Sequence, residues 1–383
     1  MGRVPRIFVI AGEPSADKHG AMLGEALLEA GKVTLAGVGQ SRMREMGFEL
    51  LFDSTDWSGI GVIDSLRRVP RLFVRMRQLT AHLTAEPPDL LVLIDFGAFN
   101  VRLARRLRGR VDCPVLYYFP PRSWSREANY TGMAGLIDRA ATPFPWSERR
   151  LLEAGIDASW VGHPVVDRIR PLSAEERSNV RTKLNVKHTG PVLGLLPGSR
   201  GTEIRCNAPQ MLEAAATIAQ EYEGLSVLLS VAPSVSEESL SEYVNRFDLT
   251  DRTTLVRGLT DIVQASDLVI ATSGTATLET AAAACPMVIV YRGTWLMSIE
   301  KRIRKFVVPF VGMPNILADK MIVPELLDQD AVAPRIAGTA LELLSDETAM
   351  LTMRESLLGL RDKLGEPGVS DRVARMALDM IST

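Results

Sequence analysis

Short apolar runs alternate with stretches of helical spacing along the whole chain. A run of four to six apolar residues without polar alternation favours a strand that is buried on both faces. The expected strands are Arg6–Ala11, Val33–Val38, Asp89–Asp95, Val115–Phe119, Ala140–Phe144, Ala158–Val161, Val192–Leu196, Leu225–Val231, Thr254–Val256, Asp267–Ala271 and Met287–Tyr291. Residues 12–17 are expected to form a turn before the first helix. Strands that alternate with helices predict an α/β protein with doubly wound parallel sheets.

The length of the chain indicates more than one domain. At 383 residues it exceeds the size of one typical core. Residues 165–190 are polar and charged, and they separate two series of strands and helices. We therefore expect a first Rossmann-like domain over 1–170 and a second over 190–345. Residues 346–383 are expected to form helices that pack back on the first domain.

Composition excludes several classes of protein. The chain is 46% hydrophobic and 23% charged, which fits neither a disordered protein nor a membrane bundle. Its net charge of −2 gives no general attraction to nucleic acid. The three cysteines and four histidines are scattered, so we expect no metal site and reduced thiols in a cytoplasmic protein. The apolar start is short and is interpreted as a strand, not a signal peptide, and no run is long enough to span a membrane.

Two turns rich in small residues follow buried strands in the second half. One is Pro197–Gly201 (PGSRG), and the other is Ser273–Thr275 before an alanine-rich helix. Each can direct backbone N–H groups and a positive helix end at a phosphate, and Arg200 adds a bidentate donor. Glu279, one turn into the second helix, is placed to accept hydrogen bonds from ribose hydroxyls. An ordinary N-cap is the alternative for each turn alone, but the pair predicts a nucleotide-sugar transferase.

A basic amphipathic helix is expected near residues 66–79. Apolar residues fall at 66, 69, 72, 73, 76 and 79, and the arginines stand at 67, 68, 71, 75 and 77. Such a helix can lie on an anionic membrane surface. The alternative is a helix that packs on the core and exposes a solvated basic face.

Many motifs in order resemble those of the lipid-A-disaccharide synthase family. They are AGEPSAD at 11–17, IDFGAFN at 94–100, GHP at 162–164, LLPGSRGTE at 195–203, SGTATLE at 273–279, CPMVIVY at 285–291 and MPNILADKMIVPELL at 313–327. The resemblance covers nearly the whole chain. It implies the GT-B architecture, in which two Rossmann-like doubly wound domains face a cleft.

The resemblance also implies an activity. Members of this family move a diacylglucosamine from a UDP carrier to a lipid-linked glucosamine 1-phosphate, without metal or cofactor, and release UDP. They are peripheral proteins on the inner face of the cytoplasmic membrane and can form homodimers that exchange C-terminal elements. The residues of this chain that are implied to contact UDP are Ser199, Arg200, Glu203, Ser273, Gly274, Thr275, Glu279 and Asn315.

Two departures from the family pattern fall in the first half. Ala98 stands where the family usually has an aspartate that is a leading candidate for the general base, and residues 120–126 keep only Pro121 and Trp124 of the usual loop. The candidate catalytic residues are therefore Asp17, His19 and Asp95. His19 is singled out because an unperturbed imidazole titrates near ~6.5 and a helix N-terminus keeps it neutral, although it could simply cover the helix start.

Three functions are consistent with these residues. The first is a transferase of the lipid-A-disaccharide synthase type, with or without a changed acceptor. The second is a non-catalytic protein that binds a UDP-sugar or lipid after loss of the aspartate at position 98. The third is a UDP-sugar epimerase, which shares the architecture, although the basic helix at 66–79 argues against it.

Overall fold

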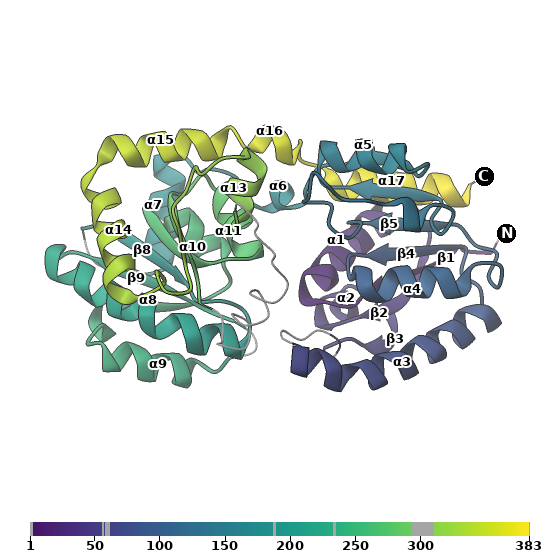
Figure 1. Cartoon of the computed structure of the whole chain (residues 1–383), viewed down its shortest axis with the longest axis horizontal. Coiled ribbons are helices and arrows are strands. Elements are labelled where there is room, and N and C mark those ends of the chain that lie inside the picture. The colour runs from purple at the N-terminus through teal and green to yellow at the C-terminus, as the bar shows by residue number, and fades with distance from the viewer. Residues whose placement is uncertain are drawn as a thin grey trace. The chain divides into compact units, whose positions relative to one another are not determined.

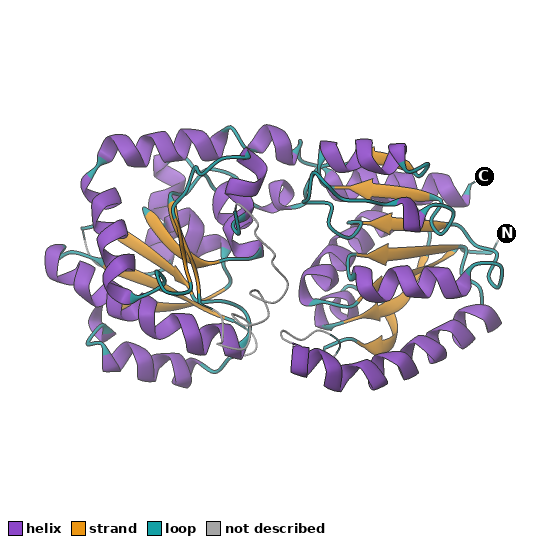
Figure 2. Cartoon of the chain, in the orientation of Figure 1, coloured by secondary structure: helices purple, strands orange, loops and turns teal. Residues whose placement is uncertain are grey.

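The chain divides into two compact units (Figures 1 and 2). The computed structural model describes residues 3–55, 57, 62–186, 189–232, 235–292 and 310–382, with the backbone alone for 62–69. Unit 1 comprises Met1–Asp167 and Leu364–Thr383, and unit 2 comprises Arg168–Lys363. The chain therefore passes from unit 1 to unit 2 and back again.

Unit 1 is built on a seven-stranded sheet in the order β3-β2-β1-β4-β5-β6-β7. The strands are β1 (Arg6–Ala11), β2 (Thr34–Gly39), β3 (Glu49–Asp53), β4 (Leu90–Ile94), β5 (Val115–Tyr118), β6 (Arg139–Thr142) and β7 (Asp157–Trp160). Every pair of neighbours is parallel. All five residues of β4 are buried, as its unbroken apolar run requires of a strand with helices on both faces.

Helices cover both faces of this sheet. They are α1 (Pro14–Ala30), α2 (Ser41–Glu45), α3 (Val62–Ala85), α4 (Gly97–Leu107), α5 (Pro145–Glu153), α6 (Val165–Arg168), which ends in unit 2, and α17 (Val369–Ile381). Side chains of α3, α4 and α5 share one core with the sheet. Helix α17, from the end of the chain, packs against α1 near the start (Figure 1).

Unit 2 repeats the architecture with a six-stranded sheet in the order β10-β9-β8-β11-β12-β13. Its strands are β8 (Val192–Leu196), β9 (Ser226–Val231), β10 (Thr253–Arg257), β11 (Leu268–Thr272), β12 (Met287–Tyr291) and β13 (Glu325–Leu327). They are also parallel throughout. The predicted α/β class with two doubly wound parallel sheets is confirmed.

Helices surround this second sheet (Figure 2). They are α7 (Ala174–Lys183), α8 (Gly201–Glu221), α9 (Glu237–Arg246), α10 (Thr260–Ala265), α11 (Thr275–Ala282), α13 (Met313–Ala318), α14 (Ala333–Ser345), α15 (Glu347–Leu358) and α16 (Arg361–Leu364). One apolar core joins residues of α8 and α14 to those of β8, β9 and β11.

The polar stretch 165–190, expected as a linker, contains helix α7 and an anchor for it. The guanidinium groups of Arg177 and Arg181 each lie 2.8 Å from one carboxylate oxygen of Asp267. The same carboxylate accepts the backbone N–H of Val192 at 2.8 Å. One aspartate thus ties α7 to the starts of β8 and β11, which explains why a polar segment packs on unit 2.

The predicted start of the first helix is wrong. Residues 12–17 were expected to form a turn, but α1 begins at Pro14. A proline suits the first position of a helix because its fixed φ fits and its missing N–H is not needed there. Asp17 therefore lies in the first turn of α1.

We predict that Asp267→Ala lowers the free energy of unfolding of unit 2 by about 2–3 kcal/mol, because two arginines and one backbone amide lose a charged acceptor. Denaturant unfolding measures this difference. Asp261→Ala is the matched control, since Asp261 forms one exposed ion pair with Lys183 at 2.7 Å, a contact worth less than about 1 kcal/mol. Equal stability of the two variants would contradict the role given to Asp267.

Candidate functional site

The sheet of unit 2 changes winding direction between β8 and β11. These strands are neighbours, but β9 follows on the far side of β8 and β12 on the far side of β11. The turns after β8 and β11 therefore diverge at the carboxyl edge of the sheet. Open α/β sheets bind their ligands at such switch points. The two turns predicted from the sequence, Pro197–Gly201 and Ser273–Thr275, are the ones that lie there; their last residues begin α8 and α11.

The backbone amides of the turn after β8 are bonded to a carboxylate of the protein itself, that of Glu203. The backbone N–H groups of Ser199 and Arg200 donate to Glu203 Oε2 at 3.0 and 3.3 Å. The Arg200 side chain donates to Oε1 at 3.3 Å. A Cβ at Gly198, where φ is +122°, would lie 2.7 Å from this carboxylate, so glycine is needed here. Glu203 thus caps α8 and holds Arg200, and the amides expected for phosphate already have an acceptor.

The turn after β11 differs at this point. Gly274, the N-cap of α11, has φ 153° and ψ −160°, a conformation open essentially to glycine alone. No side chain caps this helix. Within the described part of the chain, no hydrogen bond is formed by the backbone N–H groups of Gly274, Thr275 or Ala276. Gly274 and Thr275 are exposed. This helix start is therefore the better anion site of the two.

Ser273 and Asn315 shape the segment beside this turn. Ser273 Oγ donates to the carbonyl of Val311 at 2.9 Å. The Asn315 amide is fully buried: its nitrogen donates to Val323 and Glu325, and its oxygen accepts from the N–H groups of Ile322 and Val323. These contacts use both donors and both acceptor positions of the amide. Asn315 therefore holds the fold of 311–325 in this structure.

Glu279 lies in the second turn of α11 and is 6% exposed. Its Oε1 accepts a hydrogen bond from Arg168 Nη1 at 3.1 Å. The second arm of Arg168 reaches Thr260 Oγ1 at 3.4 Å. The carboxylate that was expected to meet ribose is thus placed by an arginine that sequence analysis did not identify, because the pair is separated by more than a hundred residues in sequence.

Unit 1 has the same kind of switch point between β1 and β4. Asp95 and Phe96, which directly follow β4, adopt left-handed φ values of 45° and 48°. Side chains hold this unfavourable backbone: Tyr117 Oη donates to the Asp95 carbonyl at 2.7 Å, and Asn100 Nδ2 donates to it at 2.8 Å. Such strain is often found at functional sites.

The Asp95 carboxyl group lies at this edge and is partly buried. Burial, with a smaller contribution from the charge of Glu13, raises the pKa of Asp95 to about 6. A carboxylate of this basicity can exchange protons close to neutral pH. Ala98, which replaces the aspartate usual in the resembling family, is exposed in the first turn of α4.

Asp17 serves a neighbouring helix. Its carboxylate is 2% exposed and accepts the backbone N–H groups of Gln40, Arg42 and Met43 at 2.5, 3.2 and 3.3 Å. These amides begin α2, so Asp17 fixes α2 against α1. The carboxylate is engaged by backbone donors in the structure.

His19 belongs to an aromatic cluster at the ends of β5 and β6. Its ring stacks on Phe119 with centroids 4.7 Å apart and meets the ring of His163 edge-on at 6.1 Å. Burial, with a smaller effect of the charge of Lys18, lowers the pKa of His163 to about 3, so His163 is neutral at physiological pH. His19 and Asp95 both lie beside β5, since Asp95 N–H donates to the Tyr118 carbonyl and Tyr118 touches His19.

The basic helix expected from the sequence is α3, and α4 extends its basic surface. The ranges 70–85 and 97–110 together contain eight arginines and no acidic residue. All eight are exposed, at 71, 75, 77, 102, 105, 106, 108 and 110. We call them the arginine surface. The side chains of Leu66, Arg67 and Arg68, named in the sequence analysis, lie outside the described side chains.

Apolar side chains accompany this surface. Phe73 and Val74 are 50% and 53% exposed, and the Arg106 guanidinium lies 5.2 Å from the centre of the Phe73 ring. Met76, Leu79 and Leu83 are buried in the core, so α3 packs on the sheet while Phe73 and Val74 remain exposed. The two interpretations of this helix, packing on the core and contact with a membrane, are therefore compatible with each other.

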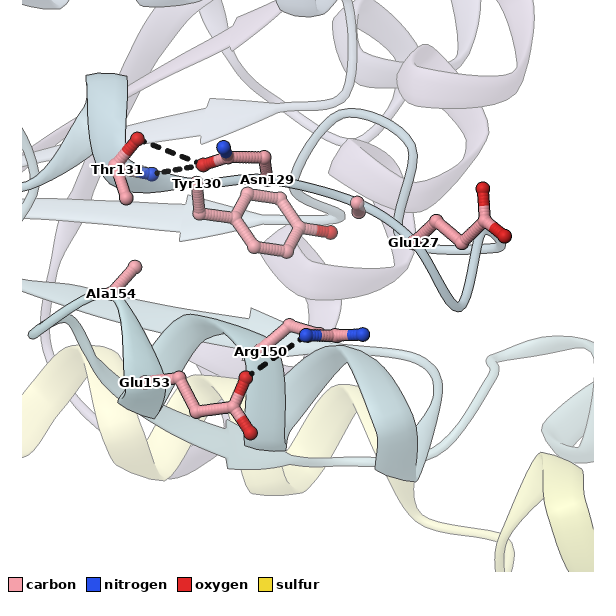
Figure 3. A pocket seen from close by; sticks show the side chains of 8 residues that line it. Glu127, Asn129, Tyr130, Thr131, Arg150, Glu153 and Ala154 are labelled. Carbon is pink, nitrogen blue, oxygen red and sulfur yellow. Dashed lines mark hydrogen bonds and ion pairs between the residues drawn. The ribbon is translucent and has the colours of Figure 1, made fainter.

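A pocket of about 350 Å³ lies in unit 1 between residues 127–131 and α5 (Figure 3). It is lined by Glu127, Ala128, Asn129, Tyr130, Thr131, Arg150, Glu153 and Ala154. Arg150 and Glu153 form an ion pair at 3.2 Å beside it, and Asn129 accepts from Thr131. None of the residues expected from the sequence to form a site lines this pocket.

Metal ligands, membrane spans and reactive thiols can be judged for the described residues. No group of three or more His, Cys, Asp or Glu side chains is arranged to hold a metal ion there. Among the helices that the structure describes, none is both long and apolar enough to cross a membrane. Burial raises the pKa of Cys113 to about 11 and that of Cys285 to about 12, so neither thiol is a nucleophile at neutral pH.

Solved structures with low sequence identity share the fold. The UDP-GlcNAc 2-epimerase of Methanocaldococcus jannaschii superposes with a TM-score of 0.59 at 14% identity, over 98% of this chain and 99% of its own. The sucrose-phosphate synthase of Thermosynechococcus elongatus gives 0.56 at 14% identity, over 99% and 100%. These likenesses confirm the two Rossmann-like domains of the GT-B architecture and carry no further argument.

Sequence comparison identifies the family. The model of the lipid-A-disaccharide synthetase family matches residues 7–370. The lipid-A-disaccharide synthase of Geobacter sulfurreducens is 36% identical, over 98% of this chain and 97% of its own length. That of Myxococcus xanthus is 35% identical over 100% and 99%, and that of Synechocystis is 34% identical over 98% and 97%. The chain therefore belongs to the lipid-A-disaccharide synthetase family.

Proposed function

We propose that this protein is a lipid-A-disaccharide synthase. It transfers a diacylglucosamine unit from a UDP donor to a lipid-linked glucosamine 1-phosphate and releases UDP. The observation that carries this proposal is the start of α11, where three consecutive amides at a switch point lack an acceptor among the described residues. It occurs in a chain that matches the family from residue 7 to residue 370.

The donor site that we propose lies in unit 2. The amides at 274–276 and the Arg200 guanidinium bind the diphosphate, and Glu279 accepts hydrogen bonds from the ribose. The positive end of α11 favours the charge that develops on UDP as it leaves. Glu203 acts by holding Arg200, as their 3.3 Å contact indicates. Ser273 and Asn315 maintain the segment 311–325 next to the diphosphate.

Inversion at the sugar carbon requires a group that takes the proton of the acceptor hydroxyl. Two side chains at the carboxyl edge of unit 1 have the chemistry for it, and both lie beside β5. Asp95 has a carboxylate whose pKa is raised to about 6, and His19 has an imidazole. Asp17 supports them by fixing α2 against α1, the helix that carries His19.

We also propose that the protein binds reversibly to an anionic membrane surface through the arginine surface and Phe73. Arginines attract anionic headgroups, and an exposed aromatic ring gains free energy in the interfacial region. The half-exposed Phe73 and Val74, in a stretch of helix from 70 to 85 that has no acidic residue, support this proposal.

Product analysis tests the proposed activity directly. Purified protein is incubated with UDP-diacylglucosamine and diacylglucosamine 1-phosphate, and the lipids are identified by mass spectrometry. The expected products are the tetraacylated disaccharide 1-phosphate and UDP in equal amounts. UDP binding without any disaccharide would favour a binding protein that has lost catalysis with the aspartate at position 98.

We predict that Arg200→Ala weakens UDP binding by about 2–3 kcal/mol, the value of a charge-assisted contact with phosphate. Isothermal titration calorimetry measures it. Arg246→Ala, at the end of α9, removes an arginine of the same unit and should leave the affinity unchanged. If wild type and Arg200→Ala bind UDP equally, Arg200 has no part in the donor site.

A second prediction separates the two proton acceptors. Asp95 must be ionised to accept a proton, so with its pKa near 6 the value of kcat/KM should fall as the pH drops through about 6. If Asp95 is the base, Asp95→Asn lowers kcat at least ~100-fold and removes this limb. If His19 is the base, His19→Ala lowers kcat at least ~100-fold while UDP affinity stays unchanged.

The melting temperature of Asp95→Asn shows whether this variant still folds. Burial raises the pKa of Asp95 above its ordinary value, so ionised Asp95 costs stability at pH values above 6. A neutral asparagine in its place therefore should not lower the melting temperature at pH 8, and lost activity then reports chemistry. Full activity of both variants over the whole pH range would exclude both side chains as the base.

A further prediction concerns the membrane. Phe73→Asp should reduce binding to vesicles with anionic lipids roughly tenfold or more, since it removes an inserted ring and adds a repelled charge. Co-sedimentation with vesicles measures this, and binding should also decrease with added salt. Leu351→Asp is the control, because Leu351 is 52% exposed on α15 and lies in unit 2. Equal binding by both variants would assign α3 to core packing alone.

A further inference from the structure

Arg168 and Glu279 form an ion pair that is more buried than the Arg200–Glu203 pair of the proposed donor site. Their side chains are 29% and 9% exposed, and Nη1 lies 3.1 Å from Oε1. A carboxylate with so little access to water needs a cation or several donors to remain ionised. Arg168 supplies one such donor in a fixed direction.

The direction is fixed because the guanidinium is held twice. While Nη1 contacts Glu279, Nη2 donates to Thr260 Oγ1 at 3.4 Å, in the first turn of α10. The guanidinium is planar, so two contacts determine its orientation. The Glu279 carboxylate is therefore presented with one oxygen towards Arg168, four residues after Thr275, whose amide lies at the start of α11.

The backbone of Arg168 is anchored as well. The preceding residue, Asp167, accepts the N–H groups of Gly368, Val369 and Ser370, where α17 begins. On the following side, the Ile169 carbonyl accepts from Arg361 Nη1 at 3.3 Å. The same nitrogen donates to the carbonyl of Ala282, the last residue of α11, at 2.8 Å. Helix α11 is thus linked to Arg168 through Glu279. Its last residue, Ala282, is linked to Ile169 through the Arg361 guanidinium.

We infer that Arg168 is a positioning residue for the nucleotide: it orients the Glu279 carboxylate so that this group accepts hydrogen bonds from the ribose hydroxyls. The inference rests on the proposed function, in which Glu279 contacts the ribose. Arg168 itself does not touch the ligand in this scheme. Its effect should therefore be confined to ligands that carry ribose hydroxyls.

The experiment compares UDP with 2′,3′-dideoxy-UDP, which has no ribose hydroxyls. Calorimetry gives the ratio of their dissociation constants for each variant. For the wild type we expect UDP to bind about tenfold or more tightly, as for hydrogen bonds to a charged group. In Arg168→Gln the ratio should fall to within about twofold of one, while the dissociation constant of dideoxy-UDP changes by less than about threefold.

Arg170→Gln is the matched control. Arg170 lies two residues further along, is exposed, and pairs with Glu176. This variant should keep the wild-type ratio. Arg168→Lys is the second variant, because lysine keeps the positive charge but lacks the planar fork, so the fold is retained even if Arg168→Gln unfolds. Its ratio should lie between those of the wild type and Arg168→Gln.

The Glu279→Gln variant tests the proposed contact of Glu279 with ribose separately from the positioning role of Arg168. If this variant keeps the wild-type ratio, Glu279 does not bind ribose, and the donor site itself is wrong. If Glu279→Gln loses the ratio but Arg168→Gln and Arg168→Lys both keep it, Arg168 has no positioning role and only the inference fails. A loss of affinity that is equal for UDP and dideoxy-UDP in the Arg168 variants would likewise overturn it.

Discussion

Backbone N–H groups at the start of a helix need acceptors, and this protein satisfies several of them with carboxylate side chains. Asp17, Glu325 and Asp167 each join a helix start to another element, whereas Glu203 caps its own helix. The helices concerned are α2, α8, α13 and α17, and their acceptors are Asp17, Glu203, Glu325 and Asp167. The start of α11 has no side-chain cap, and the donor site that we propose is built around it.

The carboxylates also explain why the polar residues of the family motifs have unequal roles. Asn315 and Glu325 use their hydrogen bonds on the segment beside the turn after β11, whereas Glu279 faces an arginine at the point where the chain enters unit 2. The proposed donor site therefore depends on surrounding charged groups that the fold holds in place. Binding energy is not lost in ordering these groups, because the protein has ordered them already.

Much of the fold follows from the sequence because buried parallel strands have a plain signal. The strands Val192–Leu196 and Met287–Tyr291 have the predicted bounds, and the turns after β8 and β11 lie where the pattern placed them. The capping role of Glu203 was not predicted, although Glu203 stands three residues after Arg200, the spacing of a capping box. The Arg168–Glu279 pair had no local signal, since only the folded chain brings its members together. For the same reason, the basic face of α4 joined that of α3 only in the structure.

Unit 1 is assembled from both ends of the chain, with unit 2 inserted between them. During synthesis on the ribosome, unit 2 emerges as one continuous segment and can complete its core at once. Unit 1 cannot, because α17, which is made after unit 2, covers α1, which is made before unit 2. The buried residues Val369, Val373 and Ala377 of α17 reach that surface only after all of unit 2 has been synthesised. The nascent chain must therefore keep the apolar surface of α1, which α17 later covers, soluble while unit 2 folds.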